Sequence, residues 1–167
     1  MKALILHANE YLVHAESPST RIGDCEPEEW LGSDDNTGEG PPRPLKQAFV
    51  AERMEECLVV FFQVEEGDTE VMARSLCRYL KKCAKQFKTQ RVMVAPFAHL
   101  SGSHPDPEIA KDLSSLVFKL CEKWNVNGHH VWEIGSSHWG WNKSLKLDVK
   151  GHLNAFKHWS STKSAND

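Results

Sequence analysis

Apolar positions gather in short runs along this chain of 167 residues and predict several strands. The segments KALILHA (2–8) and YLVHA (11–15) read as two short strands, with the turn residues Asn9 and Glu10 between them. The segment ECLVVFFQVE (56–65) is a nearly continuous apolar run, which is typical of a strand covered on both faces. The chain is therefore expected to begin with strands.

Two amphipathic helices are predicted, each after a buried strand. The first begins after Gly67, with Asp68 or Thr69 as its N-cap, and the second begins at Pro107, with Asp106 as its N-cap. In both, apolar residues recur at three- and four-residue spacing, as on the buried face of a helix. These residues are Met72, Leu76, Leu80, Cys83 and Phe87 in the first helix and Ile109, Leu113, Leu116, Leu120 and Trp124 in the second.

Three more strands complete the predicted elements. RVMVAPF (91–97) is a buried strand between the two helices, and the segments 129–135 and 142–150 follow the second helix. The last of these alternates polar and apolar residues, which indicates one buried and one solvated face. Because both helices follow strands, a layered α/β fold is favoured over separate helical and strand regions.

The length suits a single domain, expected over residues 1–160. Residues 16–45 are rich in Pro, Gly, Ser and acidic side chains and are predicted to be a loop insertion. Residues 161–167 are predicted to be a frayed tail or linker. The chain has no apolar run long enough to span a membrane, and its first residues do not resemble a signal peptide, so a cytoplasmic location is expected.

Cysteine usage and charge add two expectations. The five cysteines form no CxxC pair and are predicted to be buried, reduced thiols; they are Cys25, Cys57, Cys77, Cys83 and Cys121. Residues 1–70 hold 5 Lys and Arg against 16 Asp and Glu, whereas residues 71–167 hold 15 against 7. This split fits solvated faces of one fold and equally fits a basic surface for a polyanion.

Two places are candidates for chemistry, since the common catalytic and nucleotide-binding fingerprints are missing. The first is Pro96 to His99, where a buried strand ends, because ligands of α/β sheets often bind beyond such strand ends. The second is SHWGWNKS (137–144), where two tryptophans flank a glycine shortly before Lys143. Packing alone explains either segment as well. His99 and His104 form only a weak metal-binding pattern, so no metal or cofactor is expected.

The order of four segments carries a family resemblance. LILHANEY, RMEECLVVFFQVEE, VMVAPFAHLS and WGWNKSLKLDVKGH occur in this order along the chain. Together they resemble the archaeal-type N-terminal editing domain of threonyl-tRNA synthetase over about residues 1–155. The resemblance implies a three-layer α/β/β fold of the D-aminoacyl-tRNA deacylase-like class, a homodimer, and hydrolysis of serine from mischarged Ser-tRNA(Thr) with Thr-tRNA(Thr) spared.

The resemblance also implies roles for single residues. Pro96, Phe97 and Ala98 would line the amino-acid pocket, and Val64 would close one wall. His99 would position serine or the terminal adenosine. Lys143 would hold the substrate or stabilise charge on the ester carbonyl, with Trp141 and Asn142 beside it as substrate-binding residues. Water would attack with help from the ribose 2′-hydroxyl of the tRNA.

Two positions depart from the family pattern. Asn142 stands where some members have tyrosine, and Phe156 stands where a glutamate is expected near the pocket, so Glu133 is a candidate substitute for that carboxylate. The alternative functions are a D-aminoacyl-tRNA deacylase and a non-catalytic tRNA-binding module of a synthetase. The partners implied are tRNA(Thr) charged with serine and the remainder of a threonyl-tRNA synthetase, in cis or in trans.

Overall fold

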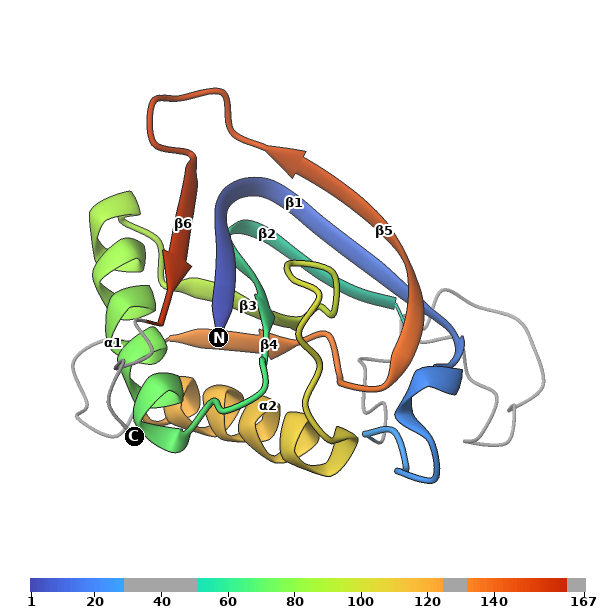
Figure 1. Ribbon diagram of the computed structural model, residues 1–167. Coiled ribbons are helices and arrows are strands. Elements are labelled where there is room, and N and C mark those ends of the chain that lie inside the picture. Colours follow the sequence, from blue (N-terminus) through green and yellow to red (C-terminus); the bar gives the residue numbers. More distant parts are fainter. Residues whose placement is uncertain (29–50, 125–131, 162–167) are drawn as a thin grey trace, which may run out of the picture.

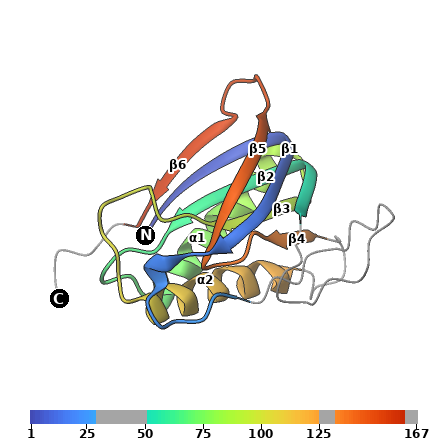
Figure 2. The ribbon, with the colours of Figure 1, turned by 90° about the vertical axis from the view of Figure 1, so that its right-hand side faces the viewer.

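Six strands and two helices make up the described part of the chain, residues 1–28, 51–124 and 132–161 of a computed structural model. The strands form one sheet in the order β4-β3-β2-β1-β5, and β6 pairs with β1 beside β5 (Figure 1). Both helices lie on one side of the sheet (Figure 2). The predicted mixed α/β fold class is confirmed.

Strand β1 (Lys2–Pro18) organises the sheet because three other strands pair with it. Strand β2 (Ala51–Gln63) runs antiparallel along one edge of β1. On the other edge, β6 (Phe156–Ser160) pairs with Lys2–Leu6, and β5 (Trp141–Val149) pairs with the part of β1 from Ala8 onward. The strand arches between these two partners in Figure 1.

The two strands expected at 2–8 and 11–15 are a single strand. The register with β5 shifts between Ala8 and Glu10, so Asn9 sits in a β-bulge and not in a turn. A bulge bends a strand without ending its pairing, and β1 remains paired with β2 on both sides of it. Polar residues such as Asn9 and Glu10 are common both in turns and in bulges, so the sequence pattern alone does not distinguish a bulge from a chain reversal.

The helices connect the parallel strands of the sheet. Helix α1 (Glu70–Phe87) links β2 to β3 (Arg91–Pro96), and helix α2 (Pro107–Glu122) precedes β4 (Glu133–Ser136). A 3-10 turn, η1 (Thr20–Ile22), follows β1. The predicted cap is confirmed at Asp106, whose side chain accepts a hydrogen bond from the Glu108 N–H at 2.9 Å. Thr69 occupies the predicted N-cap position of α1 without a side-chain hydrogen bond.

Two apolar clusters lie on opposite faces of the sheet. The helix-side core joins Ile5, Leu58, Val60 and Phe62 to residues of α1 and α2. The second cluster contains only strand residues, among them Tyr11, Val13, Met54 and Phe61. We call the side of the sheet on which this cluster lies the open face. All five cysteines are free and buried, as predicted.

Strand β6 was not anticipated, because it is a short edge strand in which Lys157 and Trp159 are half-buried between exposed neighbours. The expected insertion at 16–45 starts inside β1, and its residues 29–45 lie outside the described part, as do 162–167 and the first residues of the strand expected at 129–135. No helix among the described residues is long and apolar enough to cross a membrane.

Candidate active site

Lys143 projects from β5 onto the open face of the sheet. The strand register places Lys143 opposite Ala15 and Leu145 opposite Val13, and residues that face each other across a ladder share a face. Val13 belongs to the open-face cluster, so Lys143 shares that face although β5 is an outer strand. Lys143 therefore shares a face with Leu145, Leu147 and Val149, the apolar residues whose alternation predicted one buried face for this strand.

The Lys143 ammonium is held in a partly buried position. Its Nζ donates a hydrogen bond to the backbone carbonyl of His138 at 2.5 Å. Burial lowers the pKa of Lys143 to about 8, and the carboxylates of Glu28 and Glu52 oppose this shift. Since a lysine in water titrates near 10.4, this amine changes charge much closer to neutral pH, which is common for lysines at functional sites.

Glu52 is the residue that sequence reasoning missed at this site. It comes from β2, where it lies opposite Val13, so it shares the open face with Lys143 across β1. Its side chain is only 14% exposed, and its Oε1 lies 3.4 Å from Nδ1 of His138. Burial raises the pKa of Glu52 to about 7, with Lys143 opposing. Only the strand register reveals this proximity, because Glu52 and Lys143 are far apart in sequence.

The segment 137–141 forms the turn that carries these contacts. Ser137 is anchored by its N–H to the carbonyl of Val94 at 3.0 Å. The carboxylate of Glu28 accepts the Trp139 N–H at 2.9 Å, and the Glu28 carbonyl accepts the indole N–H of Trp141 at 2.8 Å. Trp141 therefore packs into a hydrogen-bonded turn. Burial lowers the pKa of His138, which favours its neutral ring.

Gly140 allows this turn to pack closely. Its backbone φ of +86° lies in a region that residues with a side chain rarely adopt. A Cβ at this position would also come within 2.9 Å of Pro27. The glycine between two tryptophans, noticed in the sequence, thus serves the close approach of residues 27–28 to the turn.

A stability measurement can test the environment assigned to Glu52. A carboxyl group whose pKa is raised on folding contributes full stability below its unfolded pKa and loses it as the pH rises through the folded pKa. For Glu52 the pKa rises from 4.5 in the unfolded chain to about 7 in the folded protein. This rise in pKa corresponds to a loss of about 3 kcal/mol in the free energy of unfolding between pH 4.5 and pH 7. Glu52→Gln is therefore expected to match the wild type at pH 4.5 and to be more stable by up to about 3 kcal/mol above pH 7, measured by urea unfolding. A difference that does not change with pH would contradict the assignment.

The second predicted site segment lies where β3 ends. The Phe97 N–H binds the Phe62 carbonyl at 2.8 Å, and the Phe97 ring, 38% exposed, contacts the rings of Phe61 and His99, each at 5.2 Å between centroids. Ala98 and His99 are exposed, and Pro96 is half-buried. Val64 lies in the helix-side core and not on the open face. The structure thus brings Phe97 and His99 together at one corner.

Gln63 fixes the loop that follows His99. Its side-chain oxygen accepts the N–H groups of Leu100 and Ser101 at 2.6 and 2.8 Å, and its amide nitrogen donates to the carbonyls of Ser101 and Ser103 at 3.0 and 2.8 Å. The side chain is buried at the end of β2. In the sequence, the only indication of this role is a polar residue near the end of the apolar run 56–65. The four hydrogen bonds of Gln63 hold the loop after His99 against the end of β2.

Loss of the Gln63 side-chain hydrogen bonds should destabilise the protein. Gln63→Ala is expected to lower the free energy of unfolding by about 2–6 kcal/mol, since the loop loses four hydrogen bonds, each with a net contribution of about 0.5–1.5 kcal/mol. Amide exchange at Leu100 and Ser101 should accelerate while amides in α2 stay protected. Unchanged exchange at these two residues would show that other contacts hold the loop.

Tyr11 connects the two parts of the site. Its ring packs against the ring of Phe61, with 6.3 Å between the two ring centroids. Its side chain is hydrogen-bonded to Ser137, the residue before His138. Burial raises the pKa of Tyr11, so it stays a neutral phenol. The corner around Phe97 and the turn around Lys143 therefore belong to one continuous side of the sheet.

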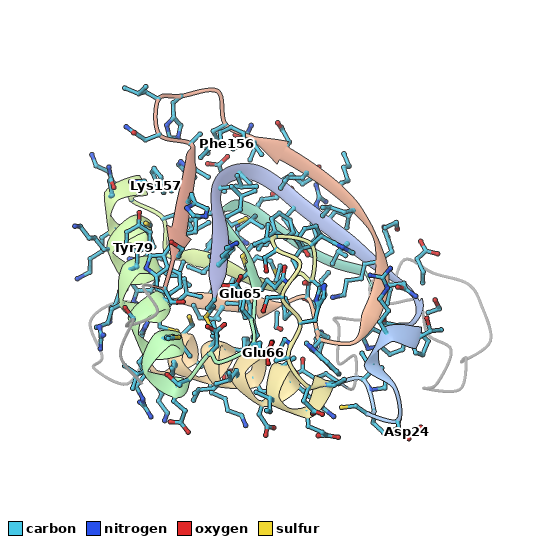
Figure 3. The ribbon with its side chains drawn as sticks, viewed as in Figure 1. Asp24, Glu65, Glu66, Tyr79, Phe156 and Lys157 are labelled. Atoms are coloured by element: carbon cyan, nitrogen blue, oxygen red, sulfur yellow. The ribbon has the colours of Figure 1, made fainter. Side chains whose placement is uncertain are left out.

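Three other positions from the sequence analysis have clear locations. Asn142 is exposed, and its amide donates to Ser17 Oγ at 3.1 Å. Phe156 lies at the start of β6, opposite Leu6 and 63% exposed (Figure 3). Glu133 forms an ion pair with Arg91 at 2.7 Å at the opposite end of β3 from Pro96. Glu133 is therefore poorly placed to substitute for the carboxylate expected at 156.

Comparison with known structures first identifies the class of fold. The chain is similar to c-Myc DNA Unwinding Element Binding Protein, with a TM-score of 0.58 and 12% sequence identity over 98% of this chain and 100% of the other. This likeness shows the fold alone.

Sequence comparison then identifies the family. Residues 42–161 match the archaea-specific editing domain of threonyl-tRNA synthetase, and the chain belongs to this family. It is 28% identical over 91% of its length to a threonine–tRNA ligase of Methanopyrus kandleri and 33% identical over 66% to one of Thermococcus gammatolerans. It spans only 20% and 17% of those two proteins. The resemblance seen in the sequence is confirmed, and the chain is an editing domain, that is, an aminoacyl-tRNA deacylase.

Proposed function

We propose that this domain removes L-serine from Ser-tRNA(Thr) and spares Thr-tRNA(Thr). The observation that carries the proposal is Lys143, a partly buried ammonium held by the His138 carbonyl on the open face, near the carboxylates of Glu28 and Glu52, in a member of the editing-domain family. A synthesis site built for threonine excludes serine weakly, because one methyl group discriminates by only about 10–200-fold. A second site that is too small for threonine supplies the missing discrimination.

In the proposed reaction, water adds to the ester carbonyl of the aminoacyl-tRNA. The 2′-hydroxyl of the terminal ribose orients this water, and the Lys143 ammonium stabilises the negative charge that forms on the carbonyl oxygen. The bond to the ribose 3′-oxygen then breaks, and the proton released by water ends on that oxygen. The products are free serine and uncharged tRNA, and the reaction uses no metal or cofactor.

The remaining residues of the proposed site bind the substrate. Pro96, Phe97 and Ala98 contact the amino acid, largely through their backbone groups, and His99 positions serine or the terminal adenosine. The exposure of Phe97 and His99 next to each other supports this role. Trp141 and Asn142 border Lys143 on β5. Val64, which the resemblance placed in the pocket wall, packs in the helix-side core, so the proposed pocket leaves it out.

The proposed partners are serine-charged tRNA(Thr), a second copy of this chain, and the remainder of a threonyl-tRNA synthetase in cis or in trans. Exposed apolar side chains at Leu145 and Phe156 support the homodimer, since both lie opposite residues of the open-face cluster. Basic side chains of α1 support contacts to tRNA phosphates; they are Arg74, Arg78, Lys81, Lys82 and Lys85. We also propose a cytoplasmic location and a single domain over residues 1–160.

A panel of charged tRNAs separates this function from its alternatives. L-seryl-tRNA(Thr) and D-threonyl-tRNA(Thr) are incubated with the chain, and the loss of each ester is followed against a blank without protein. Fast loss of the L-seryl ester alone is expected. Preferential loss of the D-aminoacyl ester would favour a D-aminoacyl-tRNA deacylase, and binding without loss of either would favour a tRNA-binding module.

A further inference from the structure

Three polar groups from separate elements meet around one backbone position on the open face. The Lys143 ammonium of β5 binds the carbonyl of His138, and the Glu52 carboxylate of β2 lies 3.4 Å from the imidazole of the same residue. Strand β1 runs between β2 and β5, and its small or apolar residues Val13 and Ala15 occupy the positions opposite Glu52 and Lys143. The two long side chains therefore reach toward His138 over the same stretch of β1.

We propose that Glu52 is a positioning residue for Lys143, holding its ammonium charged and in place against the ester carbonyl through their shared contact with His138. This inference rests on the proposed deacylation of Ser-tRNA(Thr).

The other acidic residues of the region are already engaged. Both carboxylate oxygens of Glu28 accept hydrogen bonds, one from Ser115 Oγ at 2.6 Å and one from the Trp139 N–H at 2.9 Å. Glu133 is paired with Arg91. Glu52, by contrast, lies against His138, in the turn whose backbone binds Lys143.

The groups that face this pair define its expected pH dependence. His138 contacts both side chains, Tyr11 faces Glu52 from β1, and Glu28 faces Lys143 from the segment after η1. Tyr11 stays protonated in this range, and the pKa of His138 is lowered by burial. The Glu52 carboxyl, with a pKa of about 7, and the Lys143 amine, with a pKa of about 8, therefore bracket a narrow range in which both are charged.

The pH profile of kcat/KM for Ser-tRNA(Thr) deacylation tests this pairing. The wild type is expected to show a narrow bell, with activity rising near pH 7 and falling near pH 8. In Glu52→Gln, the acidic limb should disappear and the alkaline limb should move down by roughly one pH unit, because Lys143 loses a neighbouring negative charge. Activity at pH 7.5 should fall at least about threefold, because the charged fraction of Lys143 falls by that factor when its pKa drops by about one unit, while Glu52→Asp, which keeps the charge, should recover part of it.

Matched variants keep the outcomes distinct. Lys146→Met removes an exposed lysine of the same strand on the other face and should leave the profile unchanged. If the wild type hydrolyses Ser-tRNA(Thr) and Glu52→Gln keeps both limbs, the role of Glu52 is wrong although the function stands. If the wild type itself is inactive, the proposed function fails first. Should Glu52→Gln fold poorly, Glu52→Met decides the question, since it also removes the charge and an unshifted alkaline limb in that variant overturns the pairing.

Discussion

Lys143→Met is expected to slow the deacylation of Ser-tRNA(Thr) by at least about 10²-fold while leaving tRNA affinity within about twofold. Methionine nearly preserves the volume of the side chain and removes the charge that would stabilise the oxyanion. Because burial disfavours the Lys143 ammonium, the variant should fold at least as stably as the wild type. Single-turnover deacylation and a filter-binding titration measure the two quantities.

The matched control for this substitution is Lys146→Met, whose lysine is 69% exposed and paired with Glu10. The control should keep the full rate. If tRNA affinity falls in Lys143→Met as much as the rate does, Lys143 is a phosphate contact and not part of the chemistry. A rate close to that of the wild type would remove Lys143 from the site altogether.

A tRNA that carries serine on the 3′-oxygen of a terminal 2′-deoxyadenosine is expected to be deacylated at least about 10²-fold more slowly than the normal substrate. The proposed mechanism relies on the 2′-hydroxyl to orient the attacking water, and the change removes that group without touching the protein. Rates are measured under single-turnover conditions with the same tRNA body.

Binding of the deoxy substrate should be nearly unchanged, which a competition experiment with uncharged tRNA verifies. A full rate on the deoxy substrate would show that a side chain orients the water, and Glu52 would then be the first residue to examine for that role.

Local sequence patterns were sufficient for most elements of the fold. The three- and four-residue spacing of Leu76, Leu80 and Cys83 predicted a buried helix face, and those residues are buried in the helix-side core. Asp106 before Pro107 predicted the start of α2 correctly. Such features depend on neighbours within one or two turns, so a single sequence contains them. The bulge at Asn9 shows the limit, because a bend and a reversal use the same polar residues.

The site could be predicted only in part. The strand end from Pro96 to His99 and the segment around Lys143 were candidates from the sequence pattern, and resemblance to a family supplied the roles of their residues. The structure places Lys143 on β5 and the other segment at and just after the end of β3. Glu52 was not found, because its approach to Lys143 depends on the register of three strands. Gln63 was missed for a related reason, since its four bonds go to a loop 37 or more residues away.

Stability and activity are expected to conflict at this site. Burial penalises the charged forms of both Glu52 and Lys143, so neutral replacements should stabilise the fold at neutral pH. The proposed reaction needs both charges. A stabilising substitution that abolishes deacylation would be the signature of a functional pair, as stability given up for activity is common at catalytic sites.

The most direct test of the central claim is the ratio of single-turnover rates for L-Ser-tRNA(Thr) and L-Thr-tRNA(Thr), measured side by side with this chain alone. The account predicts rapid loss of serine and a ratio of at least about 10 in favour of serine, since the site must reject one methyl group. Equal rates for the two esters, or no loss of either above the blank without protein, would contradict the claim that this domain is a serine-specific editing site.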